Sequence, residues 1–360
     1  MGWEITIDRV QRRRERPKDD DLRFGRVFAD HMFLMDYESG RGWHDPRIVP
    51  YGPLALPPAA AVLHYAQTIF EGLKAYATED GRVLLFRPRE NARRLNASAD
   101  RLCMPRVDED VFLDAIRTLV DLERDWVPSA RGTSLYIRPL YFATEEDLSL
   151  KPSARYTFAI ILSPVGSYYP RGMSPTRIFV EPDDIRSAPG GVGAAKTGGN
   201  YARCLRTEAR ASEAGYDQVL WLDGREKRYI EEVGAMNVFF RLDDKIVTPP
   251  LTGTILPGIT RDSVLRLCGK WGIEAEERKV ELREIAEAAG AGRLREAFGA
   301  GTAAVIAPIG WLHCGGDEIE INEGETGDFT EEFYEALTGI QTGRVEDGFG
   351  WTEEVPGILK

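Results

Sequence analysis

Cysteine and histidine are scarce in this chain of 360 residues, which contains only four of each. No two cysteines form a C-x-x-C motif and no H-E-x-x-H run occurs, so neither a disulfide framework nor a zinc site is indicated. The G-x-S-x-G elbow of many serine hydrolases is also missing. The sequence therefore gives no support to the common metal-dependent or serine-nucleophile mechanisms, and we expect no metal centre.

Positive charge is also in deficit, because 46 Lys and Arg residues stand against 58 Asp and Glu residues, for a formal net charge of −12. Nucleic-acid binding needs a basic surface, so we expect no nucleic-acid partner. No segment of the sequence is long and apolar enough to span a bilayer, and the N-terminus lacks the apolar core of a signal peptide. We expect a cytoplasmic protein without membrane contact.

The order of the predicted elements favours two α+β domains. Strands are expected in hairpins, around Asp223-Gly224 and Asp243-Asp244, more than in βαβ units. Residues 164–175 contain three prolines and two glycines and are the best linker candidate. Helices are expected at Asn91–Arg101, Val111–Leu122, Tyr201–Ala214, Thr260–Trp271, Leu282–Ala289, Leu294–Phe298 and after a capping box at Asp328–Glu331. Strands are expected at Val83–Phe86, Ser134–Tyr141, Tyr156–Ser163, Ile178–Glu181, Gln218–Leu222, Arg228–Glu231, Val238–Leu242, Lys245–Val247 and Thr302–Ile309.

The stretch Ala188–Asn200, APGGVGAAKTGGN, places Lys196 among small residues, with two glycines just before a predicted helix. A lysine amine that condenses with an aldehyde needs room for a planar ring, close approach of the backbone, and partial desolvation to release the neutral amine. Neither the dinucleotide fingerprint G-x-G-x-x-G nor the P-loop motif fits this stretch. Taken alone, a stretch of this kind is more often a flexible loop with a surface lysine.

Glu231 and Glu232 precede a strongly apolar predicted strand. A buried acid there needs a partner such as a pyridinium N–H, although an exposed acid at a strand end is the commoner case. The segments Ile255–Arg261 and Phe298–Ala303 offer backbone N–H groups and hydroxyls to an anion, but, taken alone, each is more often a plain helix cap or a tight turn before a strand. Three arginines follow a predicted strand end and either hold a phosphate or form a solvated basic face: Arg87, Arg93 and Arg94.

Taken together and in this order, these segments resemble the branched-chain amino acid aminotransferases, which have fold type IV of the pyridoxal 5′-phosphate (PLP) enzymes. The matching motifs run from Phe24-Gly25 to Thr302-Ala303 and are LHYAQTIFEGLKAY, LFRPRENARRL, LYIRP, PVGSYYP, KTGGNYA, EEVGAMN, ILPGITR and FGAGTA. The resemblance implies a two-domain α+β fold of the D-amino acid aminotransferase-like type. It consists of a smaller N-terminal α/β domain over 1–165, an interdomain linker over 166–175 and a larger C-terminal PLP-binding domain over 176–360, with the cofactor between the domains.

The resemblance also implies roles for individual residues. Lys196 is the Schiff-base lysine, Glu232 pairs with the pyridine nitrogen of PLP, and Tyr201 hydrogen-bonds the ring hydroxyl oxygen. The cofactor phosphate is held by Arg94, Ile259, Thr260 and Thr302. The substrate pocket is lined by Phe24, Tyr65, Phe70, Tyr136, Arg138, Tyr168, Ala235 and Ala303.

The activity implied is transamination of L-leucine, L-isoleucine and L-valine with 2-oxoglutarate, which gives branched 2-oxo acids and L-glutamate by a ping-pong PLP mechanism. A homodimer is implied, in which both subunits shape the pocket. This chain departs from some animal members of the family at Ala235, where they have threonine, and at Ala304 and Ala307, where they have a redox C-x-x-C motif. The redox regulation of those members is therefore not implied.

Three other functions remain open at this point. Another enzyme of the same fold, such as a D-amino acid aminotransferase or an aminodeoxychorismate lyase, is the nearest, but FEGLKAY, LYIRP and EVGAMN favour the branched-chain type. A PLP-binding protein without catalysis is disfavoured because Lys196, Glu232 and Tyr201 are all present. A non-enzymatic phosphate-binding module would explain the anion-binding segments but not Lys196.

Overall fold

The computed structural model describes residues 3–168 and 173–357, and the chain divides into two compact units. Unit 1 comprises residues 1–168, 195–198 and 339–360, and unit 2 comprises residues 169–194 and 199–338. The short segment that carries Lys196 therefore belongs to unit 1, although unit 2 supplies the chain on both sides of it. The domain boundaries expected from the sequence stay a prediction, and residues 169–172 of the expected linker lie outside the described residues.

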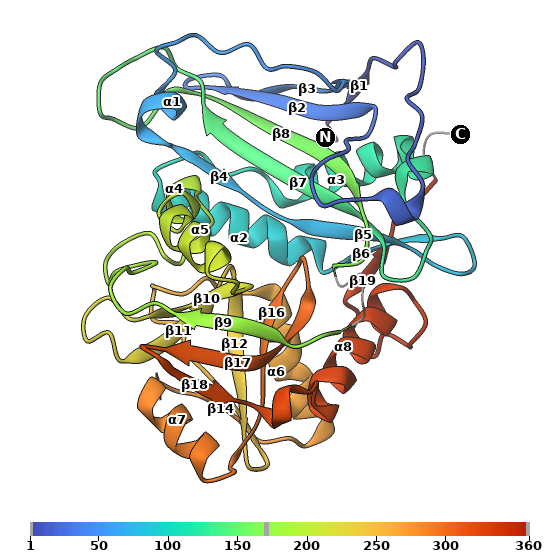
Figure 1. Ribbon diagram of the computed structural model, residues 1–360. Coiled ribbons are helices and arrows are strands. Elements are labelled where there is room, and N and C mark those ends of the chain that lie inside the picture. Colours follow the sequence, from blue (N-terminus) through green and yellow to red (C-terminus); the bar gives the residue numbers. More distant parts are fainter. Residues whose placement is uncertain (1–2, 169–172, 358–360) are drawn as a thin grey trace. The chain divides into compact units, whose positions relative to one another are not determined.

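The described part of unit 1 contains a nine-stranded sheet (Figure 1). Eight strands follow the order β1-β3-β2-β8-β7-β5-β6-β19, and β4 adds a further pairing with β7. Apart from the parallel pair of β1 and β3, neighbouring strands are antiparallel. The strands are β1 (Thr6–Ile7), β2 (His31–Glu38), β3 (Gly42–Pro50), β4 (Thr68–Phe70), β5 (Leu73–Ala77), β6 (Val83–Phe86), β7 (Ser134–Ala143), β8 (Arg155–Val165) and β19 (Thr352–Glu354).

Two long helices of unit 1, α2 (Pro88–Arg101) and α3 (Glu109–Leu122), pack in the same core as this sheet. Helix α3 begins where the Asp108 side chain accepts hydrogen bonds from two backbone N–H groups. The fully buried Phe112 of α3 stacks on Phe158 of β8 with ring centroids 5.9 Å apart. A short helix, α1 (Ala61–Tyr65), and two 3₁₀ turns, Asp19–Asp21 and Arg124–Trp126, complete the unit.

The ten described strands of unit 2 follow the order β14-β13-β12-β16-β17-β9-β10-β11-β15, with β18 against β17. Because β11 also pairs with β12, six of them close into a ring: β12, β16, β17, β9, β10 and β11. The strands are β9 (Thr176–Val180), β10 (Gln218–Leu222), β11 (Tyr229–Val233), β12 (Met236–Leu242), β13 (Lys245–Thr248), β14 (Ala275–Glu277), β15 (Val280–Glu281), β16 (Leu294–Gly301), β17 (Val305–Cys314) and β18 (Asp317–Glu320). The helices are α4 (Gly198–Ala202), α5 (Leu205–Glu213), α6 (Ile259–Trp271), α7 (Leu282–Gly290) and α8 (Asp328–Gln341), with a 3₁₀ turn at Asn322–Gly324.

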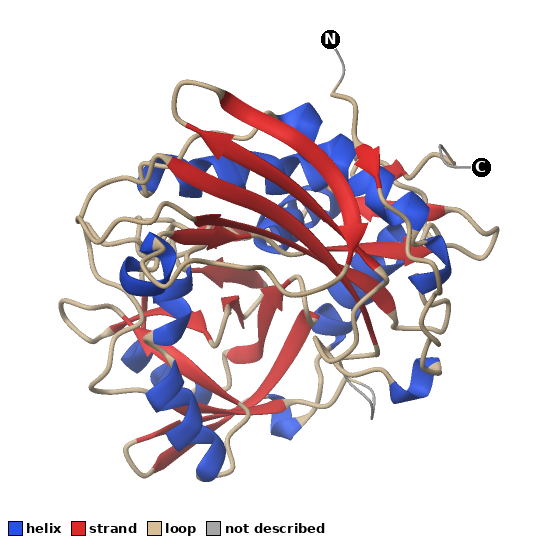
Figure 2. Cartoon of the chain, turned by 90° about the horizontal axis from the view of Figure 1, so that it is seen from above, coloured by secondary structure: helices blue, strands red, loops and turns tan. Residues whose placement is uncertain are grey.

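Strands and helices are both prominent in each unit, as expected for the α+β class (Figure 2). The two predicted hairpins are confirmed, since β10 pairs with β11 and β12 with β13, both antiparallel. The helix predicted at Leu294–Phe298 is wrong. That segment is the start of β16, which is hydrogen-bonded to β12 on one side and β17 on the other, so ladder formation overrides the helical preference of Leu, Arg, Glu and Ala. The helix predicted at Tyr201–Ala214 is interrupted and forms α4 and α5.

Candidate functional site

Lys196 is held in unit 1 by backbone hydrogen bonds on both of its sides. The Phe70 N–H donates to the Lys196 carbonyl at 3.0 Å, and the Lys196 N–H donates to Ser98 Oγ of α2 at 2.9 Å. The next residue, Thr197, donates its hydroxyl to the Thr68 carbonyl at 2.7 Å. The Lys196 amine lies over the Phe70 ring, 4.9 Å from its centroid. Lys196 is thus fixed between β4 and α2, and the alternative of a flexible surface loop does not describe it.

The surroundings of Lys196 favour its neutral amine. Burial, assisted by the charge of Arg94, lowers the pKa of Lys196 from 10.5 to about 8. The negative charge of Glu71 opposes this change. Burial also lowers the pKa of Lys74 on β5 to about 8, so a lowered pKa alone does not distinguish the two lysines. Only Lys196 has small residues around it and a GGNY segment after it.

Arg94 projects from α2 onto a residue that the sequence did not single out, Glu71. Arg94 Nε donates to Glu71 Oε1 at 2.7 Å, and its Nη2 donates to Oε2 at 2.8 Å. Burial by itself would raise the pKa of Glu71, but Arg94, together with the Lys196 charge and the Asn91 hydrogen bond, outweighs burial and holds it below its usual value. Glu71 is the acid of the FEGLKAY motif, and an acid inside such an apolar segment was the available signal.

Aromatic side chains gather around Arg138 in unit 1. The Phe24 ring meets the Tyr136 ring edge to face at 4.9 Å, and the Arg138 guanidinium lies over the rings of Phe70, at 4.7 Å, and Tyr136, at 5.3 Å. Arg138 also donates to the Tyr136 hydroxyl at 3.0 Å. Its Nε is buried and has no hydrogen-bond partner among the described residues. The structure therefore brings together four of the predicted pocket residues.

Two other predicted pocket residues of unit 1 are largely exposed. Tyr65 at the end of α1 is 42% exposed and donates its hydroxyl to the Leu148 carbonyl at 2.5 Å. Tyr168 is 44% exposed and immediately precedes the residues that are not described.

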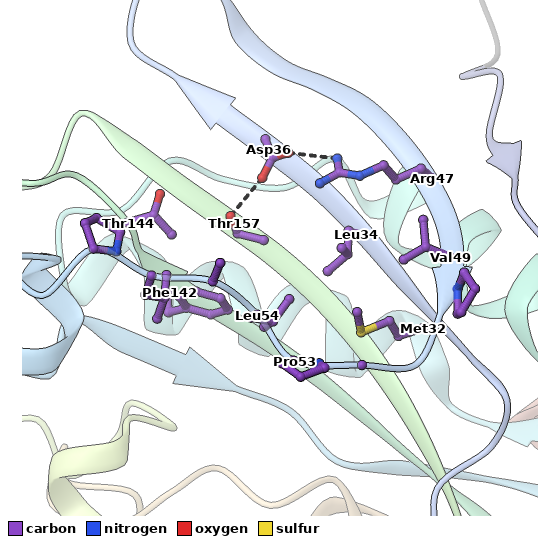
Figure 3. Close-up of a pocket in the computed structure, with 15 residues that line it drawn as sticks. Met32, Leu34, Asp36, Arg47, Val49, Pro53, Leu54, Phe142, Thr144 and Thr157 are labelled. Atoms are coloured by element: carbon purple, nitrogen blue, oxygen red, sulfur yellow. Dashed lines mark hydrogen bonds and ion pairs between the residues drawn. The ribbon is translucent and has the colours of Figure 1, made fainter.

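The cavity drawn in Figure 3 lies elsewhere in unit 1, and none of the predicted site residues lines it. Its charged groups are paired with each other, because Arg47 donates to Asp36 at 2.7 Å and Thr157 donates to the same carboxylate at 2.8 Å. The rest of its lining is mainly apolar. This cavity therefore has no group arranged for the chemistry that Lys196 suggests.

In unit 2, Glu232 is a buried acid that faces a cation and a side-chain amide. It forms an ion pair with the equally buried Arg186 at 2.7 Å, and it accepts a hydrogen bond from Asn237 of β12 at 3.1 Å. Arg186 in turn donates to the Thr254 carbonyl at 3.0 Å. Sequence reasoning missed both Arg186 and Asn237, because their pairing with Glu232 arises only in the folded chain.

Glu231 lies beside Glu232 at an irregularity in the pairing of β10 with β11. The register shifts there, so that Trp221 pairs with Glu232 and Leu222 with Ile230, and Glu231 is the extra residue of a β-bulge. Thr254 donates its hydroxyl to Glu231 at 2.5 Å. Burial raises the pKa of Glu231, and the Thr254 hydroxyl and the Arg186 charge oppose that rise. Both acids thus belong to one network around Arg186 and Thr254.

Other predicted site residues lie near the same end of the strand ring in unit 2. Ala235 is in the turn between β11 and β12, while Thr302 and Ala303 are in the turn between β16 and β17. These turns share one end because Asn237, near the start of β12, pairs with Ala300, near the end of β16.

The start of α6, which includes Ile259 and Thr260, lies beside the Asn237 side chain. A Cβ on Gly258, the residue before α6, would stand 2.0 Å from Asn237 Oδ1, so only glycine fits there. The first turn of α6 presents backbone N–H groups, which suit an anion. Tyr201 lies on α4, which follows Lys196 directly in the chain.

Within the described residues, no cluster of three or more His, Cys, Asp or Glu side chains is arranged to hold a metal ion. Among the same residues, no helix combines the length and apolarity that crossing a bilayer requires.

Comparisons with known proteins agree on one family. A family model described as amino-transferase class IV matches residues 68–310. The chain is 53% identical over 356 residues to branched-chain-amino-acid aminotransferase 2 of Bacillus subtilis (strain 168), which covers 99% of this chain and 98% of that protein. The solved branched-chain amino acid aminotransferase of Escherichia coli superposes with a TM-score of 0.73 at 30% identity, covering 91% of this chain and 99% of that one. The branched-chain amino acid aminotransferase of Thermobaculum terrenum, solved in its PLP-form, gives a TM-score of 0.73 at 25% identity, covering 90% and 98%.

Proposed function

We propose a function from the premise that this chain belongs to the class IV aminotransferases, within the branched-chain-amino-acid aminotransferase family. It transfers the amino group of L-leucine, L-isoleucine and L-valine to 2-oxoglutarate, and gives branched 2-oxo acids and L-glutamate. The observation that carries this proposal is the fixed, half-buried Lys196 with its lowered pKa. The two half-reactions follow each other in one site, by a ping-pong scheme.

The residues present fit pyridoxal 5′-phosphate, which is the cofactor proposed here. When bound, this cofactor supplies an aldehyde for an amine and a ring that accepts electrons from the substrate Cα. An amine with a pKa of about 8 and a buried carboxylate match those two parts of the molecule. The PLP-form in which the Thermobaculum terrenum enzyme was solved supports the same choice.

Lys196 is proposed to hold the cofactor covalently and then to move protons. With a pKa of about 8, its Nζ is neutral in a useful fraction of molecules near neutral pH, which a nucleophilic amine requires. With the cofactor bound, Nζ would be the group that accepts a proton from the substrate Cα and holds it for return. The backbone bonds to Phe70 and Ser98 keep Nζ within reach during both steps.

Glu232 is proposed to accept a hydrogen bond from the ring nitrogen and to keep that nitrogen protonated. An ionised carboxylate has about four lone-pair directions, so it can serve Arg186, Asn237 and the ring together. The buried Arg186 guanidinium, 2.7 Å away, supplies the positive charge that a carboxylate needs at a buried position. Glu231, which bonds Thr254, is the alternative if Glu232 proves dispensable.

The phosphate is assigned to Arg94, the start of α6 at Ile259 and Thr260, and the hydroxyl of Thr302. A charged guanidinium and the N-terminal N–H groups of a helix both favour a phosphate. Tyr201 is assigned to the ring hydroxyl oxygen. Each of these roles stays a prediction.

The substrate side chain is proposed to meet the aromatic cluster of Phe24, Phe70 and Tyr136, where desolvation favours a branched aliphatic group. Glutamate uses the same site, and its second carboxylate needs a partner. Arg138 is the proposed partner, because its Nε lacks a hydrogen bond among the described residues. The remaining proposed pocket residues are Tyr65, Tyr168, Ala235 and Ala303.

A cytoplasmic homodimer is proposed as the working form. Four apolar side chains stand exposed near α1 and the loop after β7: Leu63 is 59%, Tyr65 42%, Leu148 57% and Leu150 85% exposed. A surface of this kind commonly marks an interface. Light scattering of the purified protein would measure the mass directly.

A panel of amino donors with 2-oxoglutarate tests the function as a whole. L-Leucine, L-isoleucine and L-valine should react within about an order of magnitude of one another, since one methylene changes binding by only about 1 kcal/mol. Strong turnover of D-alanine with none of L-leucine would refute the proposal in favour of a D-amino acid enzyme.

A further inference from the structure

We propose that Glu71 is a positioning residue for the cofactor site: through its bidentate contact it holds the Arg94 guanidinium in one orientation toward the phosphate. This inference rests on the proposed function. The sequence motifs alone gave Glu71 no role, and the mechanism above makes no use of it.

The contact between Glu71 and Arg94 fixes the position and the orientation of the guanidinium group. Two parallel hydrogen bonds, from Nε at 2.7 Å and from Nη2 at 2.8 Å, join the two groups edge to edge. A bidentate pair of this type determines both the distance and the rotation of the arginine. Arg94 therefore cannot turn without breaking both bonds.

Glu71 is itself held rigidly. Its side chain is fully buried, and Oε2 also accepts from Asn91 Nδ2 at 2.8 Å and from the Gly72 N–H at 3.1 Å. Its own N–H donates to the Pro139 carbonyl at 2.9 Å, which ties it to β7. A carboxylate with this many donors has one stable position, and it transmits that position to Arg94.

One face of α2 joins Glu71 to the lysine segment. Asn91, Arg94 and Ser98 are spaced i, i+3 and i+7, so their side chains lie on the same side of the helix. Asn91 and Arg94 bind Glu71, while Ser98 accepts the Lys196 N–H at 2.9 Å. Phe70, next to Glu71 in the chain, donates to the Lys196 carbonyl at 3.0 Å. The acid, the arginine and the lysine thus share one rigid frame.

Without Glu71, this group of residues would contain two positively charged side chains, Arg94 and Lys196, and no negative one. Arg94 is buried and Lys196 is half-buried, and the charge of Arg94 disfavours the charged form of Lys196. Glu71 supplies the compensating negative charge, and its effect on Lys196 is opposite to that of Arg94. Removing that charge should lower the pKa of Lys196 further, and should leave Arg94 without its orienting partner.

The test compares Glu71→Gln with Glu90→Gln in the cofactor-free protein. Glu90 is also on this part of the chain, but it is partly exposed and pairs with Arg93, so it serves as the matched control. Each protein is titrated with pyridoxal 5′-phosphate and with pyridoxal, which lacks the phosphate. We expect Glu71→Gln to bind the phosphorylated form at least about tenfold more weakly, because a charge-assisted contact is disturbed, and pyridoxal nearly as well as the wild type does. Glu90→Gln should behave as the wild type with both.

A second readout follows Lys196 itself. The pH dependence of lysine labelling in the cofactor-free protein, resolved by peptide mapping, should shift downward for Lys196 in Glu71→Gln by about one unit and stay unchanged for Lys74. If Glu71→Gln does not fold, Glu71→Asp carries the same test. It keeps the charge, so Lys196 should titrate as in the wild type, while the shortened side chain should still weaken binding of the phosphorylated cofactor.

A double variant separates positioning from a general structural effect. Adding Glu71→Gln to Arg94→Met should weaken cofactor binding no further than Arg94→Met alone, because Glu71 acts through Arg94. Equal losses with pyridoxal and its phosphate, additive losses in the double variant, or an unshifted Lys196 titration in Glu71→Gln would overturn the inference. If the wild-type protein binds no cofactor at all, the proposed function fails instead.

Discussion

Replacing Arg138 by leucine should change the choice between substrates more than the overall rate. In the structure the Arg138 guanidinium stacks on Phe70 at 4.7 Å and donates to the Tyr136 hydroxyl at 3.0 Å. Its Nε has no partner among the described residues, so it can donate to the second carboxylate of glutamate. Leucine keeps the apolar contact with Phe70 and removes every donor.

The expected size of the effect follows from these contacts. A hydrogen bond to a charged group contributes about 1.5–3 kcal/mol, which corresponds to roughly 10- to 150-fold in kcat/KM. Arg138 is only half-buried, so a loss near the lower end, about tenfold, is expected for glutamate. Loss of the cation–π interaction with Phe70, about 0.5–1 kcal/mol, affects both substrates by about two- to fivefold. The ratio of glutamate to leucine turnover should therefore fall by about tenfold.

The assay is the single-turnover half-reaction, followed by the absorbance of the bound cofactor with L-glutamate or L-leucine as donor. Arg155→Leu is the control, because Arg155 lies on the neighbouring strand β8 with a side chain that is 63% exposed. It should leave both rates unchanged. An equal loss for the two donors in Arg138→Leu would show that Arg138 supports the pocket structure and does not bind the γ-carboxylate.

Three further predictions concern the lysine and the acid. Borohydride reduction should fix the cofactor on Lys196, and Lys196→Ala should bind it without a covalent link and lose essentially all turnover; a label on Lys74 in peptide mapping would contradict the assignment. Glu232→Gln removes a charge at nearly constant shape, so the protein should fold while the half-reaction slows by several kcal/mol of barrier, as stopped-flow measurement would reveal; a wild-type rate would move the role to Glu231. Because folding lowers the pKa of Lys196 from 10.5 to about 8, the unfolded chain binds more protons between these pH values. The stability of the cofactor-free wild type should therefore rise with pH across that window relative to Lys196→Met; parallel pH dependences in urea unfolding would contradict the lowered pKa.

The fold class and the family were accessible from the sequence because they depend on local patterns. The Asp223-Gly224 turn between two short predicted strands specifies their hairpin without reference to the rest of the chain. The motif around Lys196 is similarly local, and the comparisons confirm fold type IV and the family. The helix prediction for Leu294–Phe298 was wrong because the composition of this segment favours a helix, whereas its position between β12 and β17 requires a strand.

The partners of the site residues were not accessible, for a different reason. Glu71 and Arg94 are 23 positions apart in the sequence. Glu232 lies on β11, whereas its partner Arg186 lies in the segment that follows β9. Which cation faces which acid depends on how the helices and loops pack, and no short motif records it. The individual roles of Tyr65, Tyr168, Tyr201 and Thr302 remain predictions from the family resemblance.

The closed ring of strands in unit 2 has a consequence for the two adjacent glutamates of β11. A strand at an open edge can slip by one position and exchange neighbouring side chains, and two identical residues in a row would give such a slip little penalty. β11 is bonded to β10 on one side and β12 on the other, so slippage would have to break two ladders together and also move the bulge at Glu231. The closed ring thus fixes the register of β11, so that Glu232, and not Glu231, forms the ion pair with Arg186. A misfolded form with the two glutamates exchanged would require both ladders to break.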